Sequence, residues 1–187
     1  MDDFKLEIYK DYLYDEPKEL KKFLSSCKRM IRNSYEYSSW VSYIKFNMGI
    51  DRCIFTEESS NEVTVEIHHH PFSIENIIKV VFDKYMDDPN DDKISSVTVV
   101  EEVINLHKAF NVGFVPLVTT LHEKFHNGYL QIPMEYVKGN WRYLLTNYSI
   151  EEDIMKVVDK YLQVNIYNNP YKSWIKLNDN GVLEEAS

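Results

Sequence analysis

The sequence EVTVEIHHH, residues 62–70, decides the fold prediction. Its apolar residues alternate with polar ones up to the first histidine, and this period of two is typical of a half-buried β-strand. The same alternation places His68 and His70 on one face of the strand and His69 on the other. The sequence therefore predicts a strand whose end carries histidines on both faces.

A second stretch, FVPLVTTLHEKFH at residues 114–126, is expected to form a short apolar strand followed by a helix. Thr120 and Glu123 match a capping box, in which two side chains satisfy free backbone N–H groups at a helix N-terminus. On this helix, His122 and His126 are four residues apart and share one face, a spacing that allows two imidazoles to bind one metal ion. All six histidines of the chain lie in or between the two stretches.

Apolar periodicity predicts helices in much of the rest of the chain, whereas the last 25 residues show no clear period. With the two strands, this predicts an α+β fold that is mostly helical and forms a single domain over residues 1–187. Helices are predicted at residues 17–33, 35–48, 73–85, from about 97 to 110, and 149–162, the last with a Ser149–Glu152 capping box. The expected regions are an N-terminal helical region (1–50), a core (62–130) with a helical insertion (about 73–110), and a C-terminal helix and tail (131–187).

The composition of the 187 residues, 44% apolar and 27% charged, is that of a folded domain rather than a disordered chain. The N-terminus lacks the layout of a signal peptide, and no apolar run is long enough to cross a membrane. Cys27 and Cys53 form no CxxC motif, which argues against a four-cysteine zinc site. We therefore expect a cytoplasmic protein with no membrane partner, in a bacterial host cell if the protein is phage-encoded.

The net charge of −9 is unevenly distributed. Residues 17–50 carry a net charge of +5, whereas residues 51–102 carry −9. The positive segment offers Lys28, Arg29 and Arg32 as candidate nucleic-acid-binding residues, because a local basic surface can form on an acidic protein. A solvated helix face is the alternative.

The segments VEIHHHP and VPLVTTLHEKFHNG together resemble the HNH nucleases, also called His-Me finger or ββα-metal endonucleases. The resemblance covers about residues 62–130, a third of the chain. Val118 and Leu121 stand where many members carry zinc-binding cysteines, so this chain would be a phage-type member without that zinc. The resemblance implies that the mostly helical α+β domain contains an embedded ββα-metal finger.

The resemblance also implies a metal-dependent endonuclease that hydrolyses phosphodiester bonds of nucleic acid, with DNA as the favoured substrate. One divalent ion, Mg²⁺, Mn²⁺, Ni²⁺ or Zn²⁺, would be its cofactor. Residue by residue, it implies His68, His122 and His126 as metal ligands and His69 as the general base that activates water. A register shifted by one residue would make His69 a ligand and His70 the base.

Three further residues are candidates for the same site. His107 could be an additional ligand or a partner of one, and a buried or surface histidine is the alternative. Asn111 could support the loop between the two strands. Glu66 shares a face with His68 and could orient a ligand, although a solvated carboxylate is the alternative.

Two other functions fit the same residues. A catalytically inactive relative of the HNH fold would bind a protein or nucleic-acid partner in a phage assembly or counter-defence system. A metal-stabilised structural domain would use its histidines to hold the fold together, and it would unfold when the ion is chelated.

Overall fold

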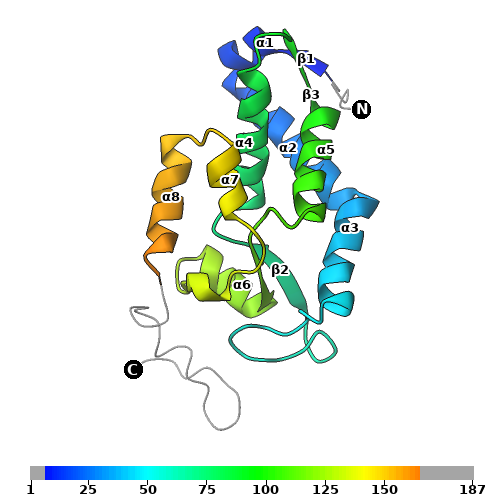
Figure 1. Ribbon diagram of the computed structural model, residues 1–187, viewed down its shortest axis with the longest axis vertical. Coiled ribbons are helices and arrows are strands. Elements are labelled where there is room, and N and C mark those ends of the chain that lie inside the picture. Colours follow the sequence, from blue (N-terminus) through cyan, green and yellow to red (C-terminus); the bar gives the residue numbers. More distant parts are fainter. Residues whose placement is uncertain (1–6, 165–187) are drawn as a thin grey trace.

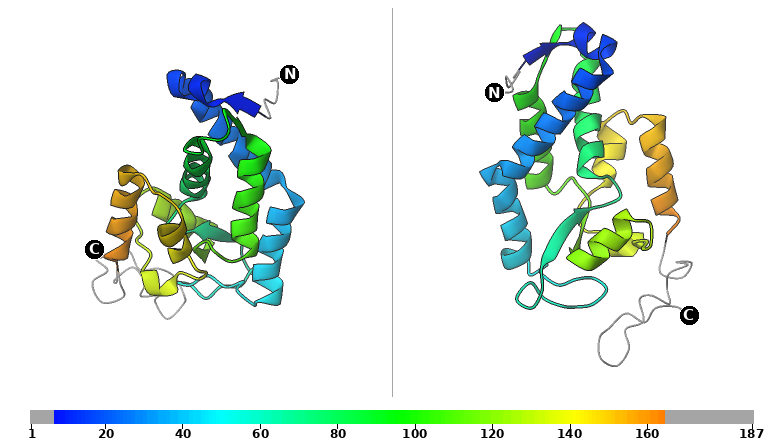
Figure 2. Two further views of the ribbon diagram at one scale, coloured as in Figure 1. Left: turned by 45° about the horizontal axis from the view of Figure 1, so that its top comes forward. Right: turned by 180° about the vertical axis from the view of Figure 1, so that it is seen from behind.

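The computed structural model describes residues 7–164 (Figure 1; Figure 2 gives two further views). It is 56% helical with small two-stranded sheets, so the prediction of a mostly helical α+β fold is confirmed. In chain order, the elements are β1 (Glu7–Tyr9), α1 (Lys10–Asp15), α2 (Pro17–Asn33), α3 (Tyr35–Ser42), the π-helical turn η1 (Tyr43–Asn47), β2 (Val65–His69), α4 (Ile74–Met86), β3 (Lys93–Ser95), α5 (Ser96–Lys108), β4 (Phe114–Val118), α6 (Thr119–His126), the 3-10 turn η2 (Met134–Tyr136), α7 (Arg142–Asn147) and α8 (Glu152–Leu162).

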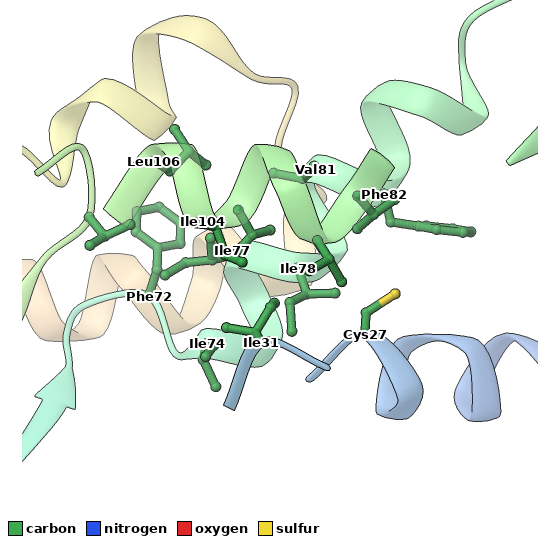
Figure 3. Close-up of a cluster of buried hydrophobic side chains, with 14 of the residues drawn as sticks. Cys27, Ile31, Phe72, Ile74, Ile77, Ile78, Val81, Phe82, Ile104 and Leu106 are labelled. Atoms are coloured by element: carbon green, nitrogen blue, oxygen red, sulfur yellow. The ribbon is translucent and has the colours of Figure 1, made fainter. Parts of the chain in front are cut away.

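The main core lies where α2, α4 and α5 pack together, as Figure 1 shows. Each of these helices has apolar residues at helical spacing, so one face can be buried while the other stays in water. Figure 3 shows the contact, with Cys27 and Ile31 of α2 facing Ile77 and Ile78 of α4. Burial raises the pKa of the Cys27 thiol to about 12, so the thiol stays neutral and acts as a packed apolar group.

Two strands far apart in sequence form the sheet that matters for the histidines. β2 pairs with β4 in antiparallel register, with His68 opposite Val115 and His69 opposite Phe114. The helical insertion between these strands consists of α4, β3 and α5, and α6 follows β4 directly. The order strand, strand, helix is therefore present, although β2 is shorter than the predicted strand of residues 62–70.

Gly113 allows the two strands to approach closely just beyond the histidine run. The His70 N–H donates to the Gly113 carbonyl at 3.0 Å. A Cβ atom on Gly113 would lie 2.0 Å from the His70 carbonyl oxygen and 2.8 Å from the Cβ of Trp141. Both distances are far below van der Waals contact, so only glycine fits this position without moving the backbone.

Most of the predicted helices are confirmed, and the best-defined start is at Ser73, whose hydroxyl accepts from the Asn76 N–H at 3.1 Å. The helix predicted at 17–33 has the observed bounds of α2, and the one predicted at 35–48 is observed as α3 followed by η1. No helix within residues 7–164 is long and apolar enough to span a membrane.

The two predicted capping boxes are wrong. Helix α6 continues directly from β4, so its N-cap falls on Val118 rather than Thr120, and no side chain in the described part of the chain caps it. Helix α8 starts at Glu152 with Glu151 as N-cap, not Ser149.

Helices α1 and α7 were not predicted because six residues are too few to show a period. The predicted tail beyond residue 164 lies outside the described residues.

Candidate metal centre

Strand β2 and helix α6 bring three histidines together at one place. His68 lies near the end of β2, and His122 and His126 lie one turn apart on α6, which contacts both β2 and β4. Figure 1 shows α6 beside the arrow of β2. The structure therefore joins the strand histidine and the helix pair that the sequence places more than 50 residues apart.

The three imidazole rings form a compact triangle. The ring centroid of His68 lies 4.7 Å from that of His122 and 5.2 Å from that of His126, and the two helix rings are 4.6 Å apart. One nitrogen from each ring lies within 4.8 Å of the others. The Nε2 atoms of His122 and His126 are only 2.9 Å apart. Three nitrogen donors this close together could hold one metal ion.

Glu66 determines which nitrogen of His122 faces the other two rings. Its Oε2 accepts a hydrogen bond from Nδ1 of His122. In the tautomer that carries its proton on Nδ1, His122 presents the lone pair of Nε2 toward His126. A carboxylate that orients a histidine in this way is typical of metal sites. The strand alternation that placed Glu66 on the face of His68 is the sequence signal for this contact.

His68 is the buried member of the trio, and its Nε2 has no hydrogen-bond partner among residues 7–164. Burial, with smaller contributions from the other histidines, lowers its pKa to about 2. Burial also lowers the pKa of the exposed His126, although Glu75 and Glu66 oppose the shift. Both rings are therefore neutral at pH 7, which is the form that binds metal ions.

His69 points to the other face of β2 and is enclosed. Its Nε2 lies 2.8 Å from Nε2 of His107, whose Nδ1 donates to the Val103 carbonyl at 2.6 Å. His107 must therefore accept with Nε2, and His69 donates. The rings of Tyr37 and Trp40 pack against this pair. Burial lowers the pKa of His107 to about 4 and that of His69 well below its ordinary value.

His70 and Asn111 lie outside the trio. His70 is buried between the rings of Phe125 and Tyr161, at centroid distances of 5.4 and 4.5 Å, and burial lowers its pKa to about 3. Neither of its ring nitrogens has a hydrogen-bond partner of normal geometry in the described part of the chain. The side-chain oxygen of Asn111 accepts from the amide of Asn140 at 3.3 Å.

The basic residues of α2 are partly committed to contacts within the protein. Lys28 forms an ion pair with Glu75, and the Arg32 guanidinium lies 5.7 Å from the ring centroid of Tyr37. Arg29 is exposed. Nucleic-acid binding by Lys28, Arg29 and Arg32 stays a prediction.

Comparison with known proteins overturns the resemblance to HNH nucleases. A family model described as Bacteriophage G278-like virion protein matches residues 1–182. No curated protein and no solved structure matches the chain.

The predicted endonuclease activity and the inactive HNH relative are therefore both wrong, and the role of His69 as the base of phosphodiester hydrolysis is withdrawn with them. The histidine pattern indicates that imidazoles converge, but their convergence alone does not distinguish a nuclease from a virion protein. The phage setting was right. The chain belongs to the Bacteriophage G278-like virion protein family.

Proposed function

We propose that this protein is a structural component of a phage particle and that it acts by binding other particle proteins rather than by turning over a substrate. One observation carries the proposal: the virion protein family matches residues 1–182. That span includes every described element, from β1 to α8. The helical core and the histidine trio are thus both parts of the family's own domain.

The surroundings of the histidines support a binding role. The histidine first expected to act as a base, His69, is 5% exposed and uses its Nε2 to hold His107. A general base must come within hydrogen-bond reach of the proton that it removes. Enclosed between Tyr37, Trp40 and His107, His69 instead contributes to the packing of α3 and α5 against β2.

A contact surface for another particle protein is available along α3 and η1. Tyr35 and Phe46 are 81% and 73% exposed, and Tyr43 and Met48 are about half exposed. Aromatic residues and methionine are enriched in the central parts of protein interfaces, and apolar groups on one surface segment mark a site of association. We therefore assign the contact with another particle protein to α3 and η1.

Mass spectrometry of particles purified on a density gradient tests the particle role. We expect peptides of this chain at a constant ratio to the main capsid protein. A nonsense mutation in its gene should yield incomplete or non-infectious particles that are rescued by the wild-type chain in trans. Particles that lack the chain and form normally without it would contradict the proposal.

Two matched variants test the contact surface. Phe46→Ser and Tyr35→Ser remove exposed aromatic rings, so the isolated protein should keep its stability while its incorporation into particles falls. Tyr129→Ser is the control, because Tyr129 is also 59% exposed but follows α6 and belongs to neither α3 nor η1. Equal incorporation of all three variants would refute the assignment to α3 and η1.

A further inference from the structure

We propose that His68, His122 and His126 form a binding site for one divalent transition-metal ion of the zinc class, and that the ion fastens helix α6 to strand β2. The site does not depend on the particle role, because a chain found outside particles would still bind the ion. His68 comes from strand β2, and His122 and His126 come from helix α6. The helix is not part of the sheet that β2 forms with β4.

The spacing of the nitrogens suits a small tetrahedral ion. Zn²⁺ binds imidazole nitrogen at about 2.0–2.1 Å, which places neighbouring ligand atoms of a tetrahedron about 3.3 Å apart. The Nε2 atoms of His122 and His126 are 2.9 Å apart, and the ligand atoms of all three residues lie within 4.8 Å of each other. The first distance is about 0.4 Å below the ideal separation and the upper limit is about 1.5 Å above it, so side-chain rotations that move the ligand atoms by up to about 1.5 Å would complete the geometry.

The hydrogen bonds of the cluster select the ligand atoms. Because Glu66 accepts from Nδ1 of His122, the Nε2 of that ring is an acceptor, and the Nε2 of His126 supplies the proton between them. Binding of the ion displaces this proton, and His126 then carries its proton on Nδ1. Each ring presents one lone pair to the ion.

The buried Nε2 of His68 provides a second, independent observation. It is shielded from solvent in a side chain that is 5% exposed, and nothing within residues 7–164 donates to it or accepts from it. Buried polar atoms without a partner are rare, and each one needs an explanation. A metal ion at the centre of the trio would satisfy this atom.

The donor set determines the class of ion. Three imidazoles favour Zn²⁺, Co²⁺, Ni²⁺ or Cu²⁺, whereas Mg²⁺ and Ca²⁺ prefer oxygen ligands. In the described part of the chain, no further His, Cys, Asp or Glu joins the three. The fourth position therefore falls to water or to a group from another molecule, and the exposed side chain of His126 lets the ion enter from solvent.

Helix α6 is the element that gains most from such an ion. It has eight residues, and among them only Leu121 is buried. A helix this short depends on tertiary contacts, because it has too few hydrogen bonds of its own to be stable. An ion bound to both helix histidines and to His68 of β2 would hold both turns of α6 in place.

Calorimetric titration of the full-length, tag-free chain with Zn²⁺, Co²⁺ and Mg²⁺ in separate experiments tests the site. We expect one Zn²⁺ or Co²⁺ per chain, no binding of Mg²⁺ in the same range, and strong visible absorption by bound Co²⁺, which is typical of tetrahedral coordination. Zn²⁺ at about 100 times its Kd should raise Tm by about 5–10 °C. A wild-type chain that binds no Zn²⁺ or Co²⁺ would overturn the proposal.

Variants at exposed positions separate loss of the site from loss of the fold. His126→Ala should weaken Zn²⁺ binding at least about 10-fold and remove the Tm increase while leaving the metal-free circular dichroism spectrum unchanged. Equal Zn²⁺ affinity in this variant and the wild type would show that the ion binds elsewhere, and would overturn the assignment.

Glu66 is a positioning residue in this proposal, and its effect has a matched control. Glu66→Gln should lower Zn²⁺ affinity about 10–100-fold, because outer partners of ligating histidines contribute on that scale. Glu123→Gln removes an exposed carboxylate of α6 and should leave affinity unchanged. Amide hydrogen exchange of α6 should slow on Zn²⁺ addition in the control but much less in Glu66→Gln. Equal behaviour of the two variants would refute the role of Glu66.

Discussion

The two faces of strand β2 carry the same residue type but place it in opposite surroundings. On one face, His68 meets His122 and His126 at an edge open to solvent. On the other, His69 bonds to His107 beneath the rings of Tyr37 and Trp40. The rings of the first set converge and can be reached from solvent, whereas those of the second are paired and enclosed.

The difference shows that what packs on a strand face determines what its histidines can do. The face that carries His68, here called the open face, packs against α6. This helix brings two more imidazoles and leaves His126 exposed to solvent. The face that carries His69, here called the closed face, packs against α3 and α5. These helices bring aromatic rings and one imidazole partner. Single substitutions in the metal-free protein should therefore affect the two faces differently.

The largest effect is expected at Gly113, where both faces depend on one backbone contact. In Gly113→Ala, the new Cβ would lie 2.0 Å from the His70 carbonyl oxygen, so β2 and β4 must separate. We expect a loss of about 3 kcal/mol or more in the free energy of unfolding measured with urea. Gly128→Ala is the control, because its Cβ meets nothing within 4 Å and only its φ of +77° is unfavourable. That variant should lose about 1–2 kcal/mol; equal losses would contradict the account of the close approach.

The next effect concerns the closed face alone. His107→Ala leaves a cavity beside Trp40 and removes the acceptor of the His69 N–H. We expect urea unfolding to show a loss of about 2–4 kcal/mol, from the cavity and the unpaired donor together. His107→Gln, which keeps an acceptor, should lose less. A loss below about 0.5 kcal/mol in His107→Ala would mean that this face is not a packed interior.

Acid should destabilise the metal-free protein through the same closed pair. The pKa of His107 is about 4 when folded, below its ordinary value of about 6.5 when unfolded. The unfolded chain therefore binds more protons, and the contribution of His107 is present above pH 6.5 and is lost as the pH falls toward 4. Between pH 6.5 and 5, the wild type should lose about 1–2 kcal/mol more than His107→Ala, measured by urea unfolding with EDTA present. Parallel pH profiles would show that His107 is not held neutral by the fold.

The smallest effect is expected on the open face. Without metal, His126→Ala should change the free energy of unfolding by less than about 0.5 kcal/mol, because an exposed side chain on the last turn of α6 contributes little packing. Thermal and urea unfolding in EDTA measure this change. A loss as large as that of His107→Ala would show that the open trio stabilises the apo fold, and the contrast between the two faces would fail.

Much of the fold could be predicted from local patterns. The bounds of α2 and β4 and the Ser73 cap follow from periodicity and capping chemistry, which act between residues close in sequence. The wrong caps at Thr120 and Ser149 were predicted from the same kind of local pattern, which does not include contacts between distant residues. The start of α6 depends on how the chain leaves β4, and the pairing of β4 with β2 is a contact between distant residues.

Local sequence patterns are sufficient to predict a mostly helical α+β protein in which the histidines of residues 68–70 alternate between two faces of a strand. Which face packs against α6 and which against α3 and α5 depends on the packing of the whole chain. That packing pairs His69 with His107 and brings His68 to His122 and His126. The physical reason is that a strand's alternation depends on its own backbone geometry, whereas the partner of each face depends on how helices from distant segments share one core.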